Sequence, residues 1–101
     1  MYTLTTTAAF DSAHFLHGYD GKCSNIHGHR WTLKVTIAKD SLQIGGQQDG
    51  MVIDFGDLKA AVRSLADAWD HALIYQEGTL KPVTVSALQE ENFRMIAVPF
   101  R

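Results

Sequence analysis

Two histidines separated by one residue, His27 and His29, have the spacing of metal ligands on a strand. Residues i and i+2 of a strand point to the same face, roughly 6.5–7 Å apart, so two imidazoles can converge on one ion. His14, in an earlier extended segment, can supply a third nitrogen, and Gly28 allows the backbone to approach closely. Three histidines with an open fourth position are typical of a catalytic zinc site. The alternative is that these are ordinary polar residues at the start of a strand.

Cys23 is the only cysteine of the chain, so no intrachain disulfide can form. It precedes His27 in a loop that must pass near the metal pocket, and the positive charge of Lys22 favours the thiolate. This position favours a catalytic base or nucleophile. A zinc ligand or an inert, small apolar side chain are the alternatives.

Asp70 and His71 follow a predicted helix, and a carboxylate beside an imidazole can fix its tautomer and raise its basicity. On local evidence alone, the favoured interpretation is a histidine that only satisfies the last carbonyls of the helix. His17 is interpreted as a loop residue, with a fourth metal ligand as the alternative. Basic side chains near the histidines could attract an anionic substrate, although an exposed strand face would give the same pattern: Lys22, Arg30 and Lys34.

Two strands must position these histidines. Apolar residues alternate through the first ten positions, and His14 continues the apolar parity of that strand. A turn-rich loop follows between Leu16 and Ile26. From about His27 to Ala38 the odd positions are histidine or apolar and the even positions mostly polar, so both histidines face the buried side.

The rest of the chain predicts a helix and one more strand. Residues 41–50 form a glycine-rich connection that could wrap around a neighbouring subunit. Asp54 or Asp57 can cap a helix that runs to about Trp69, with an apolar stripe of Leu58, Val62, Leu65 and Trp69. The stretch around Gly78 and Pro82 is irregular, and residues 93–100 favour a short strand. The pattern predicts an α+β fold whose sheet edges are unpaired, so that another chain completes it or the sequence is the front part of a longer protein.

Composition narrows the class of protein. The chain has 101 residues, 46% of them hydrophobic, and a net charge of −2. We therefore expect a single globular domain over residues 1–101, with so small a core that an enzyme would need to be an oligomer. No basic field favours nucleic acid or an anionic membrane surface, and no apolar run predicts a membrane span or signal peptide. The expected location is the cytoplasm.

Taken together, the motifs resemble the family of 6-pyruvoyl-tetrahydropterin and 6-carboxy-tetrahydropterin synthases. Their order and spacing agree over residues 2 to about 75. The resemblance implies the tunnelling fold, an antiparallel sheet of four strands packed on two helices in subunits that associate into homo-oligomers, commonly hexamers. The segments that carry it are Phe10-Asp11-Ser12-Ala13-His14, Cys23-Ser24-Asn25-Ile26-His27-Gly28-His29, Gly50-Met51-Val52-Ile53-Asp54-Phe55 and Asp70-His71.

The resemblance also implies roles and a reaction. It makes Cys23 the general base and Asp70 with His71 the acid–base relay, and it assigns zinc to three ligands, His14, His27 and His29. The spacing from the cysteine to the histidine pair is similar to the bacterial 6-carboxy enzymes of queuosine biosynthesis, and animal pyruvoyl enzymes have a longer gap. The implied substrate is 7,8-dihydroneopterin triphosphate, with release of acetaldehyde and triphosphate.

The sequence departs from the family pattern at its end. Family members continue past Val98-Pro99 with a second helix and two strands that supply a glutamate anchoring the pterin. Glu90 and Glu91 lie too early to replace it, and we therefore expect a fragment. A pyruvoyl synthase and a non-catalytic zinc-binding module are the alternatives.

Overall fold

The computed structural model describes residues 1–101 as four strands and two α-helices, in the order β1 (Tyr2–His14), β2 (His27–Lys39), α1 (Phe55–Trp69), β3 (Leu73–Gln76), α2 (Pro82–Glu90) and β4 (Met95–Val98). A short 3-10 helix, η1, covers Lys22–Ser24. The strands form one sheet in the order β2-β1-β3-β4. This mixed sheet with two helices confirms the predicted α+β class. Neither helix has the length and apolar character needed to cross a membrane.

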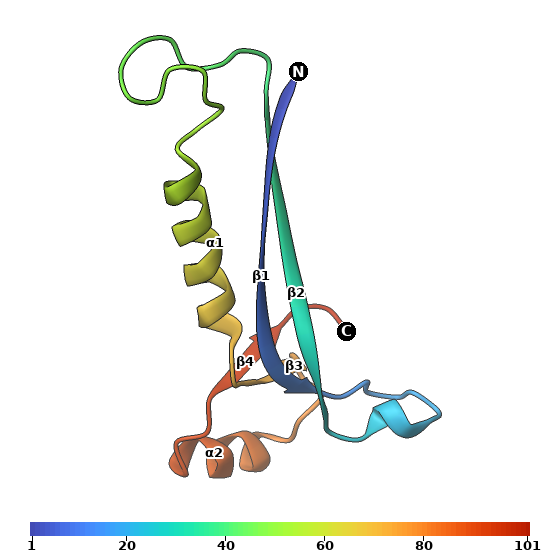
Figure 1. The fold of residues 1–101 in the computed structure, drawn as a ribbon. Helices are drawn as coiled ribbons and strands as arrows, with labels where there is room; N and C mark the ends of the chain where they lie inside the picture. The colour runs from blue at the N-terminus through green and yellow to red at the C-terminus, as the bar shows by residue number, and fades with distance from the viewer. The chain divides into compact units, whose positions relative to one another are not determined.

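Strands β1 and β2 follow the predicted alternation, except that His29, expected on the buried side, is exposed. They lie side by side and run in opposite directions (Figure 1). Along β2 the odd positions from Trp31 to Ile37 are half-buried and the even positions between them are exposed. In β1 the side chains of Thr6, Ala8 and Ser12 are buried on the same parity as His14. The period of two therefore fixes which side chains share a face.

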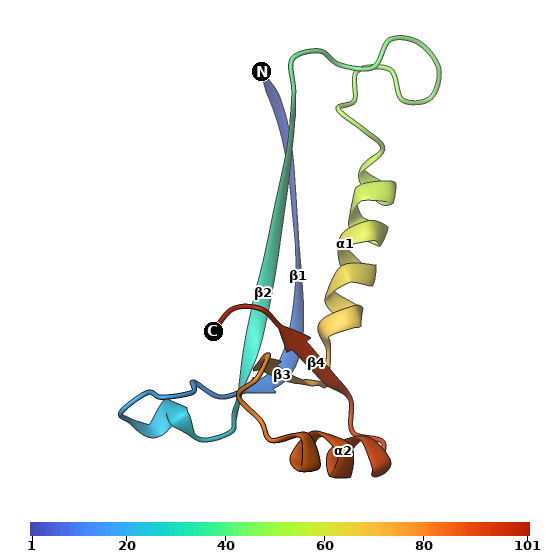
Figure 2. The ribbon, with the colours of Figure 1, turned by 180° about the vertical axis from the view of Figure 1, so that it is seen from behind.

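The resemblance implied an antiparallel sheet, but the sheet in the structure is mixed. β3 pairs in parallel with β1, at Ala13 and Leu73, and also with β4, from Leu73–Met95 to Gln76–Val98. The chain reaches β4 from β3 through α2, seen from behind in Figure 2. A helical crossover of this kind returns the chain to the end where the first strand began, so the second strand runs parallel to it.

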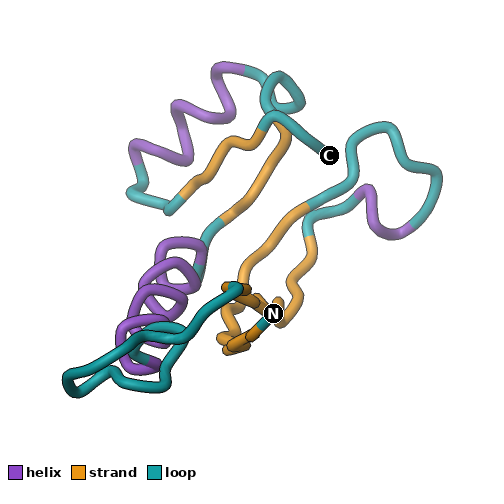
Figure 3. Tube along the Cα trace, turned by 90° about the horizontal axis from the view of Figure 1, so that it is seen from above, coloured by secondary structure: helices purple, strands orange, loops and turns teal.

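Two compact units make up the chain. The first comprises residues 1–9 and 32–68, and the second comprises residues 10–31 and 69–101. The first holds most of α1 and the long connection between β2 and α1, drawn as loop in Figure 3. All the candidate site residues fall in the second unit.

Helix α1 begins where the sequence predicts, with Asp54 as its cap. The Asp54 carboxylate accepts the Gly56 N–H at 2.8 Å, which satisfies a donor that has no partner within the helix. The predicted stripe needs one correction, because Ala66 is buried and Leu65 is 47% exposed. At about 100° per residue the buried face centres on Val62, which places Ala66 inside it and Leu65 at its rim.

Candidate metal centre and acid–base pair

Three imidazoles meet where β1 ends and β2 begins. His14 is the last residue of β1, and His27 and His29 open β2 on the neighbouring strand. One potential ligand atom from each histidine lies within 4.8 Å of the other two. The ring centroids are 4.5 Å apart for His14 and His27, 5.1 Å for His14 and His29, and 4.8 Å for His27 and His29. The structure therefore brings together the three residues that the sequence spacing predicted to share one face.

Two of these rings present buried nitrogens that have no partner. The Nε2 atoms of His14 and His27 are inaccessible and make no hydrogen bond. His27 Nδ1 lies 2.7 Å from the Asn25 carbonyl oxygen, which can only accept, so Nδ1 carries a proton and the neutral tautomer that fits this contact has its lone pair on Nε2. Buried polar atoms without partners are costly, and a backbone carbonyl that fixes the tautomer is typical of metal-ligating histidines. These residues fit a divalent cation such as zinc.

The environment keeps His14 neutral, as a metal ligand must be. Burial lowers the pKa of His14 below its ordinary value, and repulsion from His27 and His29 lowers it further. Trp31, next on the same face of β2, packs edge-on against His14 and His29 at 5.0 and 5.3 Å between centroids. Its indole Nε1 donates to the Ser12 carbonyl oxygen at 3.2 Å, which fixes the indole.

The second cluster is the pair Asp70 and His71, directly after α1. His71 Nδ1 lies 2.7 Å from an oxygen of the Asp70 carboxylate, which leaves Nε2 for proton exchange. The Asp11 backbone N–H donates to the other carboxylate oxygen at 2.9 Å, and this hydrogen bond is the main reason that the pKa of Asp70 is lowered, followed by the hydrogen bond from His71. The His71 side chain is 79% exposed. Adjacent residues thus form the contact that the sequence alone left open.

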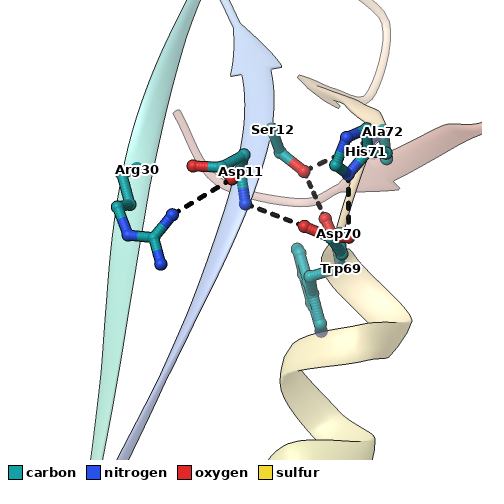
Figure 4. A network of polar contacts seen from close by, with 7 residues as sticks. All are labelled: Asp11, Ser12, Arg30, Trp69, Asp70, His71 and Ala72. Carbon is teal, nitrogen blue, oxygen red and sulfur yellow. Dashed lines mark hydrogen bonds and ion pairs between the residues drawn. The ribbon is translucent and has the colours of Figure 1, made fainter.

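β1 holds the turn that presents this pair, as Figure 4 shows. The Asp11 carbonyl oxygen accepts the His71 N–H at 2.6 Å. The Ser12 hydroxyl donates to the Trp69 carbonyl oxygen and accepts the Ala72 N–H at 3.2 Å. His71 has a φ of 52°, in the left-handed region that a non-glycine residue adopts only at a cost of about 1 kcal/mol or more. The chain therefore maintains an unfavourable conformation at a candidate catalytic residue.

Sequence reasoning did not assign roles to Asp11, Ser12 and Trp31. Ser12 gave one signal, because a polar residue occupies an inward position of a half-buried strand and needs a partner. Trp31 shares its parity with His27 and His29. The backbone contacts of Asp11 leave no signal in its residue type.

Cys23 is set apart from both clusters. It lies half-buried in η1, its carbonyl oxygen accepts the Leu16 N–H at 2.8 Å, and it is not a member of the imidazole group. His17 is exposed in the loop between β1 and η1 and is also outside that group. No hydrogen bond or ring contact joins Cys23, the imidazoles and the Asp70–His71 pair to one another. The structure therefore forms the imidazole group and the Asp70–His71 pair but does not bring Cys23 into contact with either.

A cavity of about 630 Å³ adjoins both clusters. Its lining includes His29 from the imidazole group, Arg30 directly after it, and His71 from the pair. The Arg30 guanidinium forms an exposed ion pair with Asp11 at 3.3 Å. Much of the remaining wall is apolar, from side chains such as Ile26, Leu88, Phe93 and Met95. The cavity has room for a small, partly apolar molecule next to groups that exchange protons.

Comparison with known proteins gives a consistent family. The model of the 6-pyruvoyl tetrahydropterin synthase family matches residues 3–97. A 6-carboxy-5,6,7,8-tetrahydropterin synthase of Haemophilus influenzae is 42% identical over 100% of this chain, which covers 72% of that protein. Proteins of the same name from Synechocystis and Rickettsia bellii are 34% and 37% identical over 87% and 77% of this chain, which covers 69% and 54% of their lengths.

One solved structure shares the fold. A crystal structure of an uncharacterized protein from Wolinella succinogenes superposes with a TM-score of 0.67 at 22% sequence identity. The match covers 89% of this chain and 53% of that one. At this level of identity the likeness supports the architecture alone.

Proposed function

The chain belongs to the 6-pyruvoyl tetrahydropterin synthase family, and from this premise we propose that it is a zinc-dependent lyase of queuosine and 7-deazaguanine biosynthesis. Its substrates are 7,8-dihydroneopterin triphosphate and one water molecule, and its products are 6-carboxy-5,6,7,8-tetrahydropterin, acetaldehyde and triphosphate. The observation that supports this most is the trio of imidazoles with two buried, unpartnered Nε2 atoms. The names of the relatives support the carboxy product.

His14, His27 and His29 would hold the zinc, each through one neutral imidazole nitrogen. Bound zinc supplies Lewis acidity that makes a neighbouring C–H of the substrate more acidic. The lowered pKa of His14 keeps this ligand unprotonated, and the Asn25 carbonyl holds the His27 ring with Nε2 free. The chain thus brings together one potential ligand nitrogen from each of the three imidazoles.

The remaining residues move protons. Cys23, as the thiolate, removes a proton from the substrate side chain, and His71 shuttles protons during loss of triphosphate. Asp70 orients His71 through the 2.7 Å hydrogen bond to Nδ1 and stabilises the imidazolium when His71 is charged. The cavity beside His29 and His71 gives the substrate access to both clusters.

A homo-oligomer is part of this proposal. Cys23 makes no contact with the imidazoles or with His71 within the chain, so a second subunit or a closing motion is needed to bring base, relay and metal to one substrate. The same separation favours a second candidate, a zinc-binding module without catalysis.

Product analysis tests the proposal. The purified chain, with its zinc content measured, is incubated with 7,8-dihydroneopterin triphosphate, and pterins, aldehydes and triphosphate are quantified. Acetaldehyde with a 6-carboxy pterin is the expected result. A pyruvoyl pterin would assign the alternative synthase activity, and glycolaldehyde a related aldol cleavage. Full zinc occupancy without turnover in every oligomeric state would support the module instead.

A further inference from the structure

Ser12 lies between the two clusters of the proposed site and contacts the framework of each. It is 6% exposed, on the face of β1 that also presents His14. Its carbonyl oxygen accepts the indole N–H of Trp31, which packs against two of the three imidazoles. Its hydroxyl is directed to the turn after α1 (Figure 4).

The hydroxyl bridges the two ends of the turn that contains the acid–base pair. It donates its single proton to the carbonyl oxygen of Trp69, the residue before Asp70. It accepts the backbone N–H of Ala72, the residue after His71. A hydroxyl has one donor and two acceptor positions, so both contacts form at once. An alanine or valine at this position can form neither.

The turn needs such a constraint because its conformation is unfavourable. His71 adopts a left-handed φ of 52°, and its side chain is largely exposed, so little packing holds it. The backbone of β1 adds further ties: Asp11 donates to Asp70 and accepts from His71, and the Ala13 N–H donates to the Ala72 carbonyl oxygen at 2.9 Å. Residues kept in sparsely populated backbone regions persist only where their surroundings over-determine them.

We propose that Ser12 is a positioning residue, whose hydroxyl sets the backbone of residues 69–72 so that His71 keeps its hydrogen bond to Asp70 and faces the cavity. The role in turnover rests on the proposed function, whereas the geometric role does not. Ser12 lines the cavity, but its hydroxyl is engaged by Trp69 and Ala72, and we assign it no contact with the reacting atoms or the metal. It acts through His71, and it does so through its side-chain oxygen alone.

The matched test compares Ser12→Thr with Ser12→Val, which have the same shape and differ by a hydroxyl against a methyl group. Ser12→Ala is the third variant, and Thr6→Ala is the control because Thr6 is another buried hydroxyl on the same face of β1. Two properties are measured on the zinc-loaded full chain. The first is the imidazole ¹H–¹⁵N NMR spectrum, which reports the His71 Nδ1–H. The second is steady-state turnover of 7,8-dihydroneopterin triphosphate.

The threonine variant and the Thr6→Ala control are expected to keep the hydrogen-bonded His71 Nδ1–H resonance of the unaltered protein. The alanine and valine variants should lose it through rapid exchange and bind the same amount of zinc. Their kcat should fall about 10²-fold with KM little changed, because a shift of about 1 Å in a catalytic group can cost that much.

An unchanged His71 spectrum in Ser12→Val would overturn the proposal, as would equal loss in the threonine and valine variants. If both hydroxyl-free variants fail to fold, Ser12 serves the stability of the fold and the proposal is equally wrong. Loss of the resonance in a chain without synthase activity would support the positioning role while refuting the proposed function, so the two failures are distinguishable.

Discussion

We predict that replacement of His14 by leucine stabilises the chain when zinc is absent and destabilises it when zinc is bound. In the chelated chain, the His14 Nε2 atom is buried and has no hydrogen-bond partner, so an apolar side chain of similar size removes a penalty. In the zinc-loaded chain, the same substitution removes one of three ligands. The unaltered chain should therefore be less stable than His14→Leu without zinc and more stable than His14→Leu with zinc.

The magnitudes follow from the contacts. An unpaired buried polar group costs about 1–3 kcal/mol. Loss of the edge-on packing between His14 and Trp31 costs about 0.5–1.5 kcal/mol, which leaves roughly 1 kcal/mol in favour of leucine. Free zinc at 100 times its dissociation constant adds about 2.7 kcal/mol to the unaltered chain and much less to the variant. The unaltered chain should then be the more stable by about 2 kcal/mol.

Urea unfolding followed by tryptophan fluorescence gives the free energy of unfolding near neutral pH, once with a chelator and once with excess zinc. His17→Leu is the matched control, because His17 is exposed and outside the imidazole group. It should shift neither curve. A His14→Leu chain that is less stable than the unaltered protein in chelator would refute the reasoning, since it would mean that the imidazole is satisfied in the absence of metal.

Three further predictions follow from the site. Cys23→Ala should retain zinc and cooperative unfolding but lose about 10²–10⁴-fold in turnover, and loss of zinc, measured by metal analysis, would instead make the thiol a ligand. The pKa of Asp70 is lowered from 3.8 in the folded chain, so the ionised carboxylate stabilises the fold above that pH. This stabilisation is lost as the pH falls through the lower folded pKa. In urea unfolding at descending pH, Asp70→Asn should therefore lose less of its free energy of unfolding than the unaltered chain. The pKa of His14 is lowered from 6.5 in the folded chain, so without zinc the unfolded chain binds more protons than the folded chain just below pH 6.5. The free energy of unfolding should therefore fall as the pH decreases from 6.5 to the folded pKa of His14. The same urea unfolding experiment should show a smaller fall in His14→Leu.

The sequence predicted those parts of the fold in which a period is long enough to read. Alternation over β1 and β2 placed His14, His27 and His29 on one face, and the four-residue spacing of apolar side chains predicted α1. The limits of α1 were nearly correct because Asp54 is an ordinary cap and Trp69 ends the stripe. A repeating side-chain pattern and its register are local properties, which explains this success.

The segments that the sequence analysis missed are short or lack a face. β3 has four residues, too few for an alternation to stand out. Helix α2 buries no residue completely and begins with β-branched Val83, Thr84 and Val85, so it has no apolar stripe. Pro82 was interpreted as a break, yet proline is favoured in the first turn of a helix, where its missing N–H costs nothing. Pro82 is therefore compatible both with a break in the chain and with the start of a helix, and the sequence alone does not distinguish them.

The contacts of the acid–base pair depend on tertiary structure. Ser12 and Asp11 reach residues 69–72 across more than fifty positions of the chain, and each of those contacts involves a backbone atom, which every residue type possesses. The adjacency of Asp70 and His71 suggested a relay but could not establish the hydrogen bond, because neighbours in sequence often point apart. The left-handed φ of His71 had no signal in the sequence.

The central claim is that three imidazoles bind one divalent cation while the nearby sulfur stays uncoordinated. Zinc K-edge X-ray absorption on the zinc-loaded chain measures this directly. We expect one zinc per chain with histidine nitrogens at about 2.0–2.1 Å and no sulfur shell at about 2.3 Å, and a spectrum that changes when His14, His27 or His29 is replaced. A sulfur neighbour, or a spectrum indifferent to all three replacements, would contradict it.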